Sequence, residues 1–195
     1  MNLQTRVINI LSKPSQEWPV IASESTDIAA LYKDYIMPLA AIPAICGFLG
    51  MTIMGVTIPL VGHIRTPTVS GFTNMVVGYG LSLVGIFLSA FIVDKLAPSF
   101  QSSGGIVQAM KMVAFSSTAP WLAGVLQLVP VLGGLALLAA LYGVYLFYLG
   151  LPSVMKTPPD KVIPYLVVSV IVIIVISVVT ASVSSIFVAV PRFVS

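Results

Sequence analysis

The sequence predicts an all-α polytopic membrane protein, a bundle of five transmembrane helices with a short amphipathic N-terminal helix. Of the 195 residues, 58% are hydrophobic and only 8% are charged, whereas soluble domains carry about 25% charged residues. Crossing a bilayer takes about 20 apolar residues. Four uncharged runs exceed that length, at residues 35–64, 66–93, 112–155 and 162–191. Finally, the basic residues are divided unequally between the two sides of the membrane that these spans define.

The first 34 residues predict a cytoplasmic segment at the membrane surface. Four apolar residues recur there at helical spacing, namely Leu3, Val7, Ile10 and Leu11. Arg6 and Lys13 fall off that face, which is typical of an amphipathic helix lying in the interface. Trp18 follows, and its amphipathic ring suits the headgroup level, so we expect it to be an interfacial anchor.

Two spans begin the membrane domain, which we place at residues 35–195. The first lies within residues 35–60 and the second within residues 71–93. The second span ends where charge returns to the sequence, at Asp94 and Lys95.

The second half of this domain predicts three more spans. The run 112–155 would measure about 66 Å as one helix, more than twice the thickness of a hydrocarbon core of roughly 30 Å. It must therefore fold back once, and we expect the corner at residues 127–130. This gives spans over residues 106–128 and 131–151, and a fifth span within residues 162–190.

The basic residues give the orientation, because loops rich in Lys and Arg resist translocation. Five spans place seven basic residues on the N-terminal side and two, Arg65 and Arg192, on the other. Merging the third and fourth spans would give six against three, which is a weaker separation. We expect the N-terminus in the cytoplasm and the C-terminus outside.

No constellation of residues indicates a reaction. The sequence contains no phosphate loop, HExxH motif, paired-cysteine motif or GxSxG nucleophile elbow. Cys46 is the only cysteine and His63 the only histidine, so a metal cluster would lack ligands. The basic residues are scattered singly and form no run that follows a phosphate backbone. We predict no catalytic residues, no cofactor, no metal site and no nucleic-acid partner.

Three charged residues near the middle of the chain form a candidate polar site: Asp94, Lys95 and Lys111. A charge at the centre of a transmembrane helix costs about 2.5–3.5 kcal/mol, and far less at a helix end. Interfacial anchoring is the simpler interpretation, with Lys95 at a helix C-terminus. Alternatively, Asp94 pairs with Lys111 across the second and third spans and forms a cytoplasmic-side site for a lipid head or a partner.

Small residues follow one face of the second span, in steps of four, three and four residues: Gly78, Ser82, Gly85 and Ser89. Small side chains let a second helix approach closely, so we expect this stripe to be a helix-packing face. The fifth span repeats the pattern with Ser177, Ala181, Ser185 and Ala189. A permeation path lined by hydroxyls is the alternative use of these faces.

Aromatic residues supply the remaining candidates. Tyr142 and Tyr145 lie in the cytoplasmic half of the fourth span, where an aromatic belt is expected. Alternatively, their hydroxyls line a polar cavity together with Ser177 and Thr180 of the fifth span. Trp121 in the third span is a further candidate interfacial anchor.

The fourth span and the loop after it carry a family resemblance. Residues 142–152 read YGVYLFYLGLP, and Met155, Lys156 and residues 158–161 follow. This stretch resembles the bacterial branch of the Yip family, the Ypt/Rab-GTPase-interacting membrane proteins. The LAPSF at residues 96–100 and the early Pro14, Glu17 and Trp18 fit the same pattern.

The resemblance implies a five-helix domain in a bacterial inner membrane, with a cytoplasmic N-terminus and no catalytic residues. Eukaryotic relatives bind prenylated Rab GTPases and have long cytoplasmic N-terminal regions. Only about 34 residues precede the first span here, so we do not carry GTPase binding over to this chain.

These observations favour a non-enzymatic membrane protein that acts as a scaffold or partner-binding protein through helix and lipid contacts. Its partners would be membrane lipids and other membrane proteins or further copies of itself. A small transporter, channel or lipid-moving protein is the alternative, supported by the broken helices and hydroxyl-bearing faces.

Overall fold

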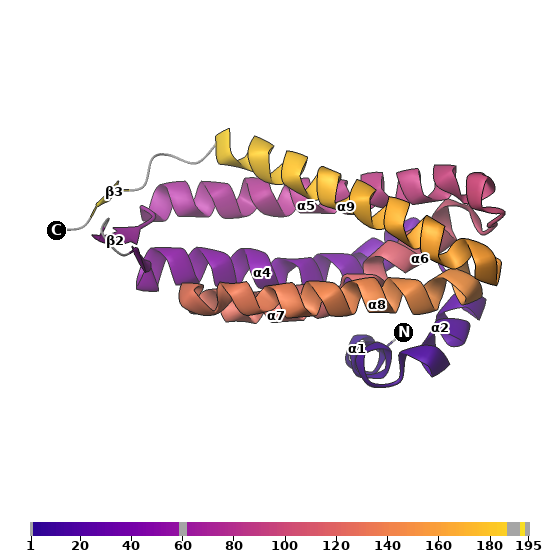
Figure 1. Cartoon of the computed structure of the whole chain (residues 1–195). Coiled ribbons are helices and arrows are strands. Elements are labelled where there is room, and N and C mark those ends of the chain that lie inside the picture. The colour runs from indigo at the N-terminus through magenta and orange to yellow at the C-terminus, as the bar shows by residue number, and fades with distance from the viewer. Residues whose placement is uncertain (1, 59–61, 187–191, 194–195) are drawn as a thin grey trace.

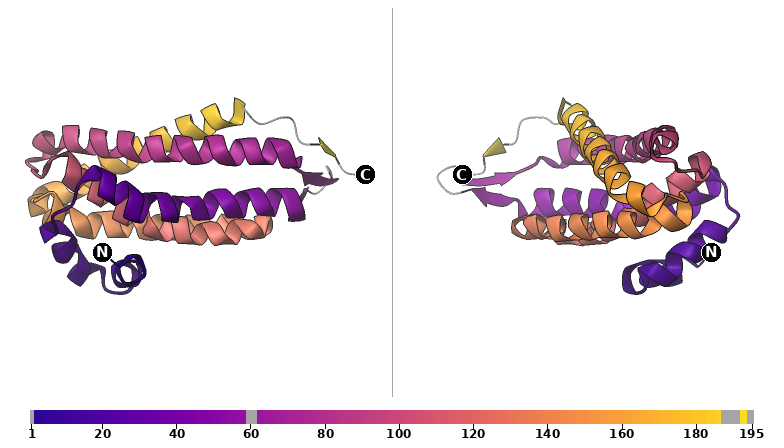
Figure 2. Two further views of the ribbon diagram at one scale, coloured as in Figure 1. Left: turned by 180° about the vertical axis from the view of Figure 1, so that it is seen from behind. Right: turned by 45° about the vertical axis from the view of Figure 1, so that its right-hand side comes forward.

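The computed structural model describes residues 2–58, 62–186 and 192–193. Helices dominate these residues, and the long helices run side by side along one axis (Figure 1). The N-terminal helices α1 (Leu3–Ser12) and α2 (Pro14–Ser23) lie together at one end of the bundle, which we call the capped end. A small sheet lies at the opposite end, which we call the hairpin end (Figure 2).

Four segments are long and apolar enough to cross a membrane: Ile28–Met54, Thr68–Phe100, Pro130–Val154 and Pro159–Ser185. Their principal helices are α4 (Met37–Leu49), α5 (Thr68–Leu96), α8 (Ala136–Val154) and α9 (Val162–Ile186). They cover the spans expected over residues 35–60, 71–93, 131–151 and 162–190 as far as these are described. Residues 59–60 and 187–190 of those spans lie outside the described residues.

The continuous third helix expected over residues 106–128 is not formed. The segment instead consists of α6 (Gly105–Ser116), α7 (Thr118–Ala123) and the 3-10 helix η4 (Gly124–Leu128). We call residues 105–128 the broken leg. The predicted corner at residues 127–130 is present, because Val129 is extended between η4 and η5 (Pro130–Leu135).

The broken leg nevertheless reaches from one end of the bundle toward the other. Just before it, Ser103 donates its backbone N–H to the carbonyl of Met155 at the capped end (2.8 Å). Near its other end, a Cβ added to Gly50 would lie 1.9 Å from the carbonyl oxygen of Gln127. Gly50 begins the π-helical turn η2 (Gly50–Met54), which follows α4 toward the hairpin end. The two backbones therefore touch there, and only glycine fits.

Side-chain hydroxyls donate to backbone carbonyls next to the interruption between α6 and α7. Pro120 has no N–H for the helical hydrogen bond back to Ser116. The hydroxyls of Ser117 and Thr118 donate to the carbonyls of Val113 (2.7 Å) and Phe115 (2.6 Å). An interrupted helix is tolerated at membrane depth when its freed polar groups find partners inside the protein.

The first long segment adapts to its prolines in a similar way. Asp27 caps α3 (Ile28–Leu31) by accepting from the N–H of Ala30 (2.7 Å). The chain then widens into the π-helical turn η1 (Tyr32–Ile36) directly before α4, whose second residue is Pro38. A proline cannot donate to the carbonyl four residues earlier, and the wider turn occurs where that bond is missing.

Strands add a feature to the expected all-α fold. β1 (Val56–Ile58), β2 (Gly62–Arg65) and β3 (Arg192–Phe193) form an antiparallel sheet in that order. Directly after β2, the N–H of Thr66 donates to the carbonyl of Met51 (3.1 Å). The sheet thus ties the connection between α4 and α5 to the chain near the C-terminus.

Close packing is concentrated toward the capped end. The largest fully buried side chains include Trp18, Tyr35, Tyr165, Lys111 and Phe115. They come from α2, η1, α9 and α6, so the N-terminal helices belong to the core. The outer faces of α8 and α9 instead expose large apolar residues such as Leu137 and Ile174, which suits contact with lipid.

Candidate functional site

The ring of Trp18 is enclosed by the protein, and the predicted role as an interfacial anchor is wrong for this residue. Its side chain is 0% exposed and meets Phe115 edge-on, with ring centroids 6.3 Å apart. A Cβ added to Gly150 of α8 would lie 2.8 Å from the indole. Gly150 therefore leaves the space that Trp18 fills. Trp121, the second predicted anchor, is also buried.

A buried ion-pair network holds α1 against α2. The guanidinium of Arg6, 6% exposed, pairs with the carboxylates of Glu17 and Glu24 and lies 5.9 Å from the centroid of the Phe115 ring. The predicted polar face of α1 therefore points inward at Arg6. A buried cation requires close carboxylates, because burial without them would cost several kcal/mol.

Lys111 caps the C-terminal end of α2. Its ammonium group, on a side chain only 2% exposed, donates to the carbonyls of Ile21 (2.9 Å) and Glu24 (2.7 Å). Gln108, one turn earlier on α6, donates to the carbonyl of Ala22 (3.2 Å). The last carbonyls of a helix lack partners within the helix and carry partial negative charge, which a cation stabilises.

The predicted pair of Asp94 and Lys111 is not formed. Among the described residues no ion pair joins them, because the Lys111 ammonium is engaged by α2. Asp94 is half-buried at the end of α5. The ammonium group of Lys95 lies 5.4 Å from the centroid of the Phe91 ring, one turn earlier on α5.

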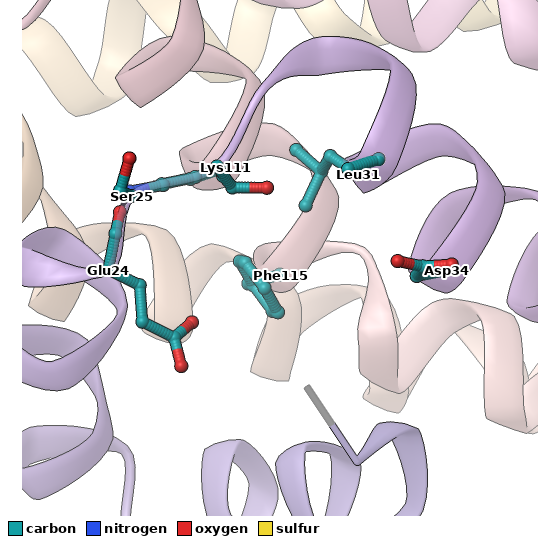
Figure 3. A pocket seen from close by; sticks show the side chains of 8 residues that line it. Glu24, Ser25, Leu31, Asp34, Lys111 and Phe115 are labelled. Atoms are coloured by element: carbon teal, nitrogen blue, oxygen red, sulfur yellow. Dashed lines mark hydrogen bonds between the residues drawn. The ribbon is translucent and has the colours of Figure 1, made fainter.

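A small cavity of about 220 Å³ lies beside this cap. Figure 3 shows Glu24 and Asp34 on opposite sides of it, with Phe115 between them. The remaining lining residues are Ser25, Thr26, Ala30, Leu31 and Lys111. Because Lys111 donates to two carbonyls and Glu24 pairs with Arg6, the charged groups of this cavity are largely used in holding α2.

The predicted cavity lining does not come together. The hydroxyl of Tyr142 donates to the carbonyl of Leu11 (2.6 Å) and so ties α8 to α1. Tyr145 is 48% exposed. The hydroxyls of Ser177 and Thr180 donate to carbonyls of their own helix. None of the four lines either cavity described here.

The small-residue stripe of α5 faces α9. A Cβ on Gly85 would lie 3.5 Å from Thr180 and 3.6 Å from Ile176, and a Cβ on Gly78 would lie 3.4 Å from Ser184. Ser89 is buried. The small-residue stripe expected on α9 does not face α5, since Ser177, Ala181 and Ser185 are exposed. Ala189, the fourth residue of that stripe, lies outside the described residues.

A larger groove of about 490 Å³ separates α4 from α5 toward the hairpin end. Small residues create it, including Ala44 and Gly47 on α4 and Gly71 and Gly78 on α5. Its remaining lining residues are Ala40, Pro43, Phe48, Met51, Thr52, Thr66, Asn74, Met75, Tyr79, Ser82, Gln127 and Ser184. The lining is uncharged and mixes apolar side chains with amides and hydroxyls.

Three hydrogen-bond donors of the groove lack acceptors within the described part of the chain. The hydroxyl of Thr52 is buried without a partner. Asn74 accepts from Ser184 through Oδ1 (2.8 Å), which leaves its NH₂ group unpaired. The NH₂ group of Gln127 has no acceptor either. A polar group at membrane depth costs free energy unless it is hydrogen-bonded. The three unpaired donors therefore make this groove the candidate binding site.

Sequence reasoning did not identify these groove residues. The available signal was that Asn74 and Gln127 are isolated amides within uncharged apolar segments, where polar residues are rare and usually functional. The Arg6 network offered no comparable signal, because Glu17 and Glu24 lie 11 and 18 residues away and across a helix break at Pro14.

Comparison with known proteins adds a family match. The model of the family described as the Yip1 domain matches residues 8–181. That range includes α2, the broken leg and most of α9, so it covers both ends of the bundle.

Two curated relatives are similar over most of their length. Both are named "Inner membrane protein YohC", one from Escherichia coli K12 and one from Escherichia coli O6:H1. Each is 27% identical to this chain over 160 residues, which covers 80% of this chain and 82% of the relative. No solved structure matches.

Proposed function

This chain belongs to the Yip1 domain family, and from that premise we propose that it is a non-enzymatic scaffold or partner-binding protein of a bacterial inner membrane. It is an integral membrane protein with several helices that can cross a bilayer. The name of the Escherichia coli relatives supports the inner membrane as its location. Its action would depend on contacts with other helices and with lipids.

Five crossings are part of this proposal. Four are the long apolar segments, and the fifth is the broken leg. The support is its course between Met155 at the capped end and Gly50 toward the hairpin end. Its interruptions carry internal hydrogen bonds, as a membrane environment requires.

We place the capped end in the cytoplasm and the C-terminus in the periplasm. Basic residues favour the cytoplasmic side, and seven of the nine belong to α1, η1, the end of α5, α6 and the connections beside α2, α8 and α9. Arg65 and Arg192 belong to strands of the hairpin end. Alkaline phosphatase fused to the C-terminus should be active and the same enzyme fused to the N-terminus inactive. Equal activity of both fusions would refute this orientation.

The groove between α4 and α5 is the observation that carries the functional proposal. Elsewhere small residues bring helices into contact, as Gly85 does with α9. Between α4 and α5, Gly71 likewise meets Phe48, but about 490 Å³ beside this contact stays unfilled, with unpaired donors at membrane depth. Such a groove fits a molecule that shares the membrane with this protein.

Photo-crosslinking in intact membranes tests this proposal. A benzophenone amino acid replaces Met75, which lines the groove, or Ile174, which lies 55% exposed on α9. We expect one or a few discrete adducts from position 75 and only diffuse, weak labelling from position 174. Identical diffuse labelling at both positions would show that the groove has no defined occupant.

The same groove supports a second candidate, a lipid-moving protein. Hydroxyls and amides along a path at membrane depth ease the passage of polar groups. Movement of labelled lipid between the leaflets of proteoliposomes, abolished by filling the groove, would favour this function over static binding.

A further inference from the structure

The groove has the length and depth of one membrane leaflet. It follows α4 and the turn η2 from Ala40 to Thr52, about 18 Å at the rise of an α-helix, or roughly half of the hydrocarbon core. The 29 residues of α5 measure about 43 Å, so each of its ends extends beyond the core. Asn74 lies six residues from the start of α5, or about 9 Å. That places its amide near the boundary between hydrocarbon and headgroups.

The groove offers donors and needs acceptors. The NH₂ groups of Asn74 and Gln127, on half-buried residues, are unpaired, whereas the unpaired hydroxyl of Thr52 is buried inside the protein. A transmembrane helix satisfies its own backbone carbonyls and brings few free acceptors. The glycerol esters and phosphate of a phospholipid present several acceptor oxygens at this depth.

The volume of the groove also favours a lipid. Its volume of about 490 Å³ lies within the range of small-molecule sites, about 300–1,000 Å³, whereas a helix about 10 Å wide is a much larger occupant. An extended acyl chain is narrow enough to lie along the groove between α4 and α5.

A cation directly precedes one lining residue of the groove. Thr66 lines the groove where the chain after β2 is hydrogen-bonded to Met51 of η2, and the preceding Arg65 is exposed. Arg65 donates through Nε to His63 (3.2 Å). A guanidinium at this position suits a phosphate group, because it offers several donors in one plane.

We propose that the groove binds one glycerophospholipid of the outer leaflet. An acyl chain lies between α4 and α5, the ester oxygens accept from Asn74 and Gln127, and the phosphate lies near Arg65. This inference rests on the proposed function and on its orientation, and it names the occupant.

Native mass spectrometry of the full chain tests the proposal. The purified protein is stripped of lipid in detergent and titrated with dioleoyl phosphatidylglycerol. We expect one lipid per chain to bind well above background. Met75→Trp, which fills the groove, should weaken binding at least tenfold, whereas Val76→Trp, on the neighbouring 50% exposed position, should leave it unchanged.

Two further variants separate the polar contacts. Gln127→Met keeps the length of the side chain and removes its donor, so we expect about fivefold weaker binding, the factor for one neutral hydrogen bond. Arg65→Gln should weaken binding of phosphatidylglycerol but not of dioleoylglycerol, which lacks the phosphate. Size-exclusion profiles and circular dichroism confirm that each variant is folded.

The outcomes distinguish this inference from the proposed function. Equal binding to the wild type and Met75→Trp overturns the lipid site. A discrete protein adduct at position 75 in membranes, without a lipid adduct, also overturns it and leaves partner binding intact. Absence of both adducts removes both proposals.

Discussion

The two ends of the bundle use similar small residues with different results. At the capped end, Gly150 admits the ring of Trp18, which is fully buried. Toward the hairpin end, Gly47 admits the side chain of Gln127 and Gly71 those of Thr52 and Phe48, but a groove of about 490 Å³ remains beside them. The buried cations of the capped end, Arg6 and Lys111, are paired, although the indole N–H of Trp18 has no partner there. Along the groove, the amides of Asn74 and Gln127 keep unpaired donors.

This contrast indicates which end gives the molecule its stability and which end meets other molecules. Binding sites are commonly places where packing and hydrogen bonding are incomplete, because a ligand completes them. The capped end should therefore respond to substitution with loss of stability, and the groove with loss of binding. Unfolding in detergent by increasing mole fraction of dodecyl sulfate, followed by circular dichroism, measures the first response.

Trp18→Ala should give the largest loss of stability. Removing a fully buried Trp side chain leaves a cavity and costs about 3–5 kcal/mol of unfolding free energy. Phe87→Ala, at a 39% exposed position of α5, is the matched control and should cost far less. The contrast between the two ends fails if Trp18→Ala has no larger effect than Phe87→Ala.

Arg6→Met should cost roughly 3 kcal/mol, because it leaves Glu17 buried without its cation. The double variant Arg6→Met with Glu17→Leu should regain much of that loss, since removing both charges also removes their desolvation cost. A double variant less stable than the single one, in the same unfolding assay, would contradict this account of the network.

Two glycine-to-alanine variants compare Gly150, whose free space is filled by Trp18, with Gly85, which lies at an ordinary contact between α5 and α9. At Gly150 the new methyl would meet the sulfur of Met112 at 2.7 Å and the Trp18 ring at 2.8 Å, so we expect a loss of about 1–3 kcal/mol. At Gly85 the nearest atom is 3.5 Å away, and alanine favours the helix. Unfolding free energies should therefore fall for Gly150→Ala and stay level or rise slightly for Gly85→Ala.

Lys111→Met should have a smaller effect than the substitutions of Trp18 and Arg6, about 1 kcal/mol. It removes hydrogen bonds to the carbonyls of Ile21 and Glu24 and also the cost of burying an ammonium group. Asp94→Asn should change stability by less than about 0.5 kcal/mol. If exchanging the residues of positions 94 and 111 restored full stability, the pairing excluded above would have to be reinstated.

Much of the bundle follows from composition and helix length. The corner at Val129 could be predicted, because a run of 44 residues cannot cross the core once. The position of the Gly78 to Ser89 stripe in the second span also follows from spacing. The break at Ser117 was missed, since an apolar sequence does not show which of its prolines a neighbouring hydroxyl will accommodate.

The orientation of individual faces was harder to predict. An amphipathic pattern such as that of Leu3 and Ile10 does not distinguish a lipid surface from a protein surface, so α1 was placed on the membrane. The fifth span is apolar on all sides, and a helix without a polar face gives no information on its rotation. Its contact face passes through Ile176, Thr180 and Ser184 instead of Ser177.

The broken leg also has a consequence for how the chain enters the bilayer during synthesis. Hydroxyls contribute to the hydrogen bonds of its short helices, and that of Thr118 lies 2.6 Å from the hydroxyl of Tyr35 in the first long segment. We therefore expect the leg to reach its position after that earlier segment is in place. Ribosome-bound chains truncated shortly after Leu128 should therefore retain the leg only when the first two membrane segments precede it.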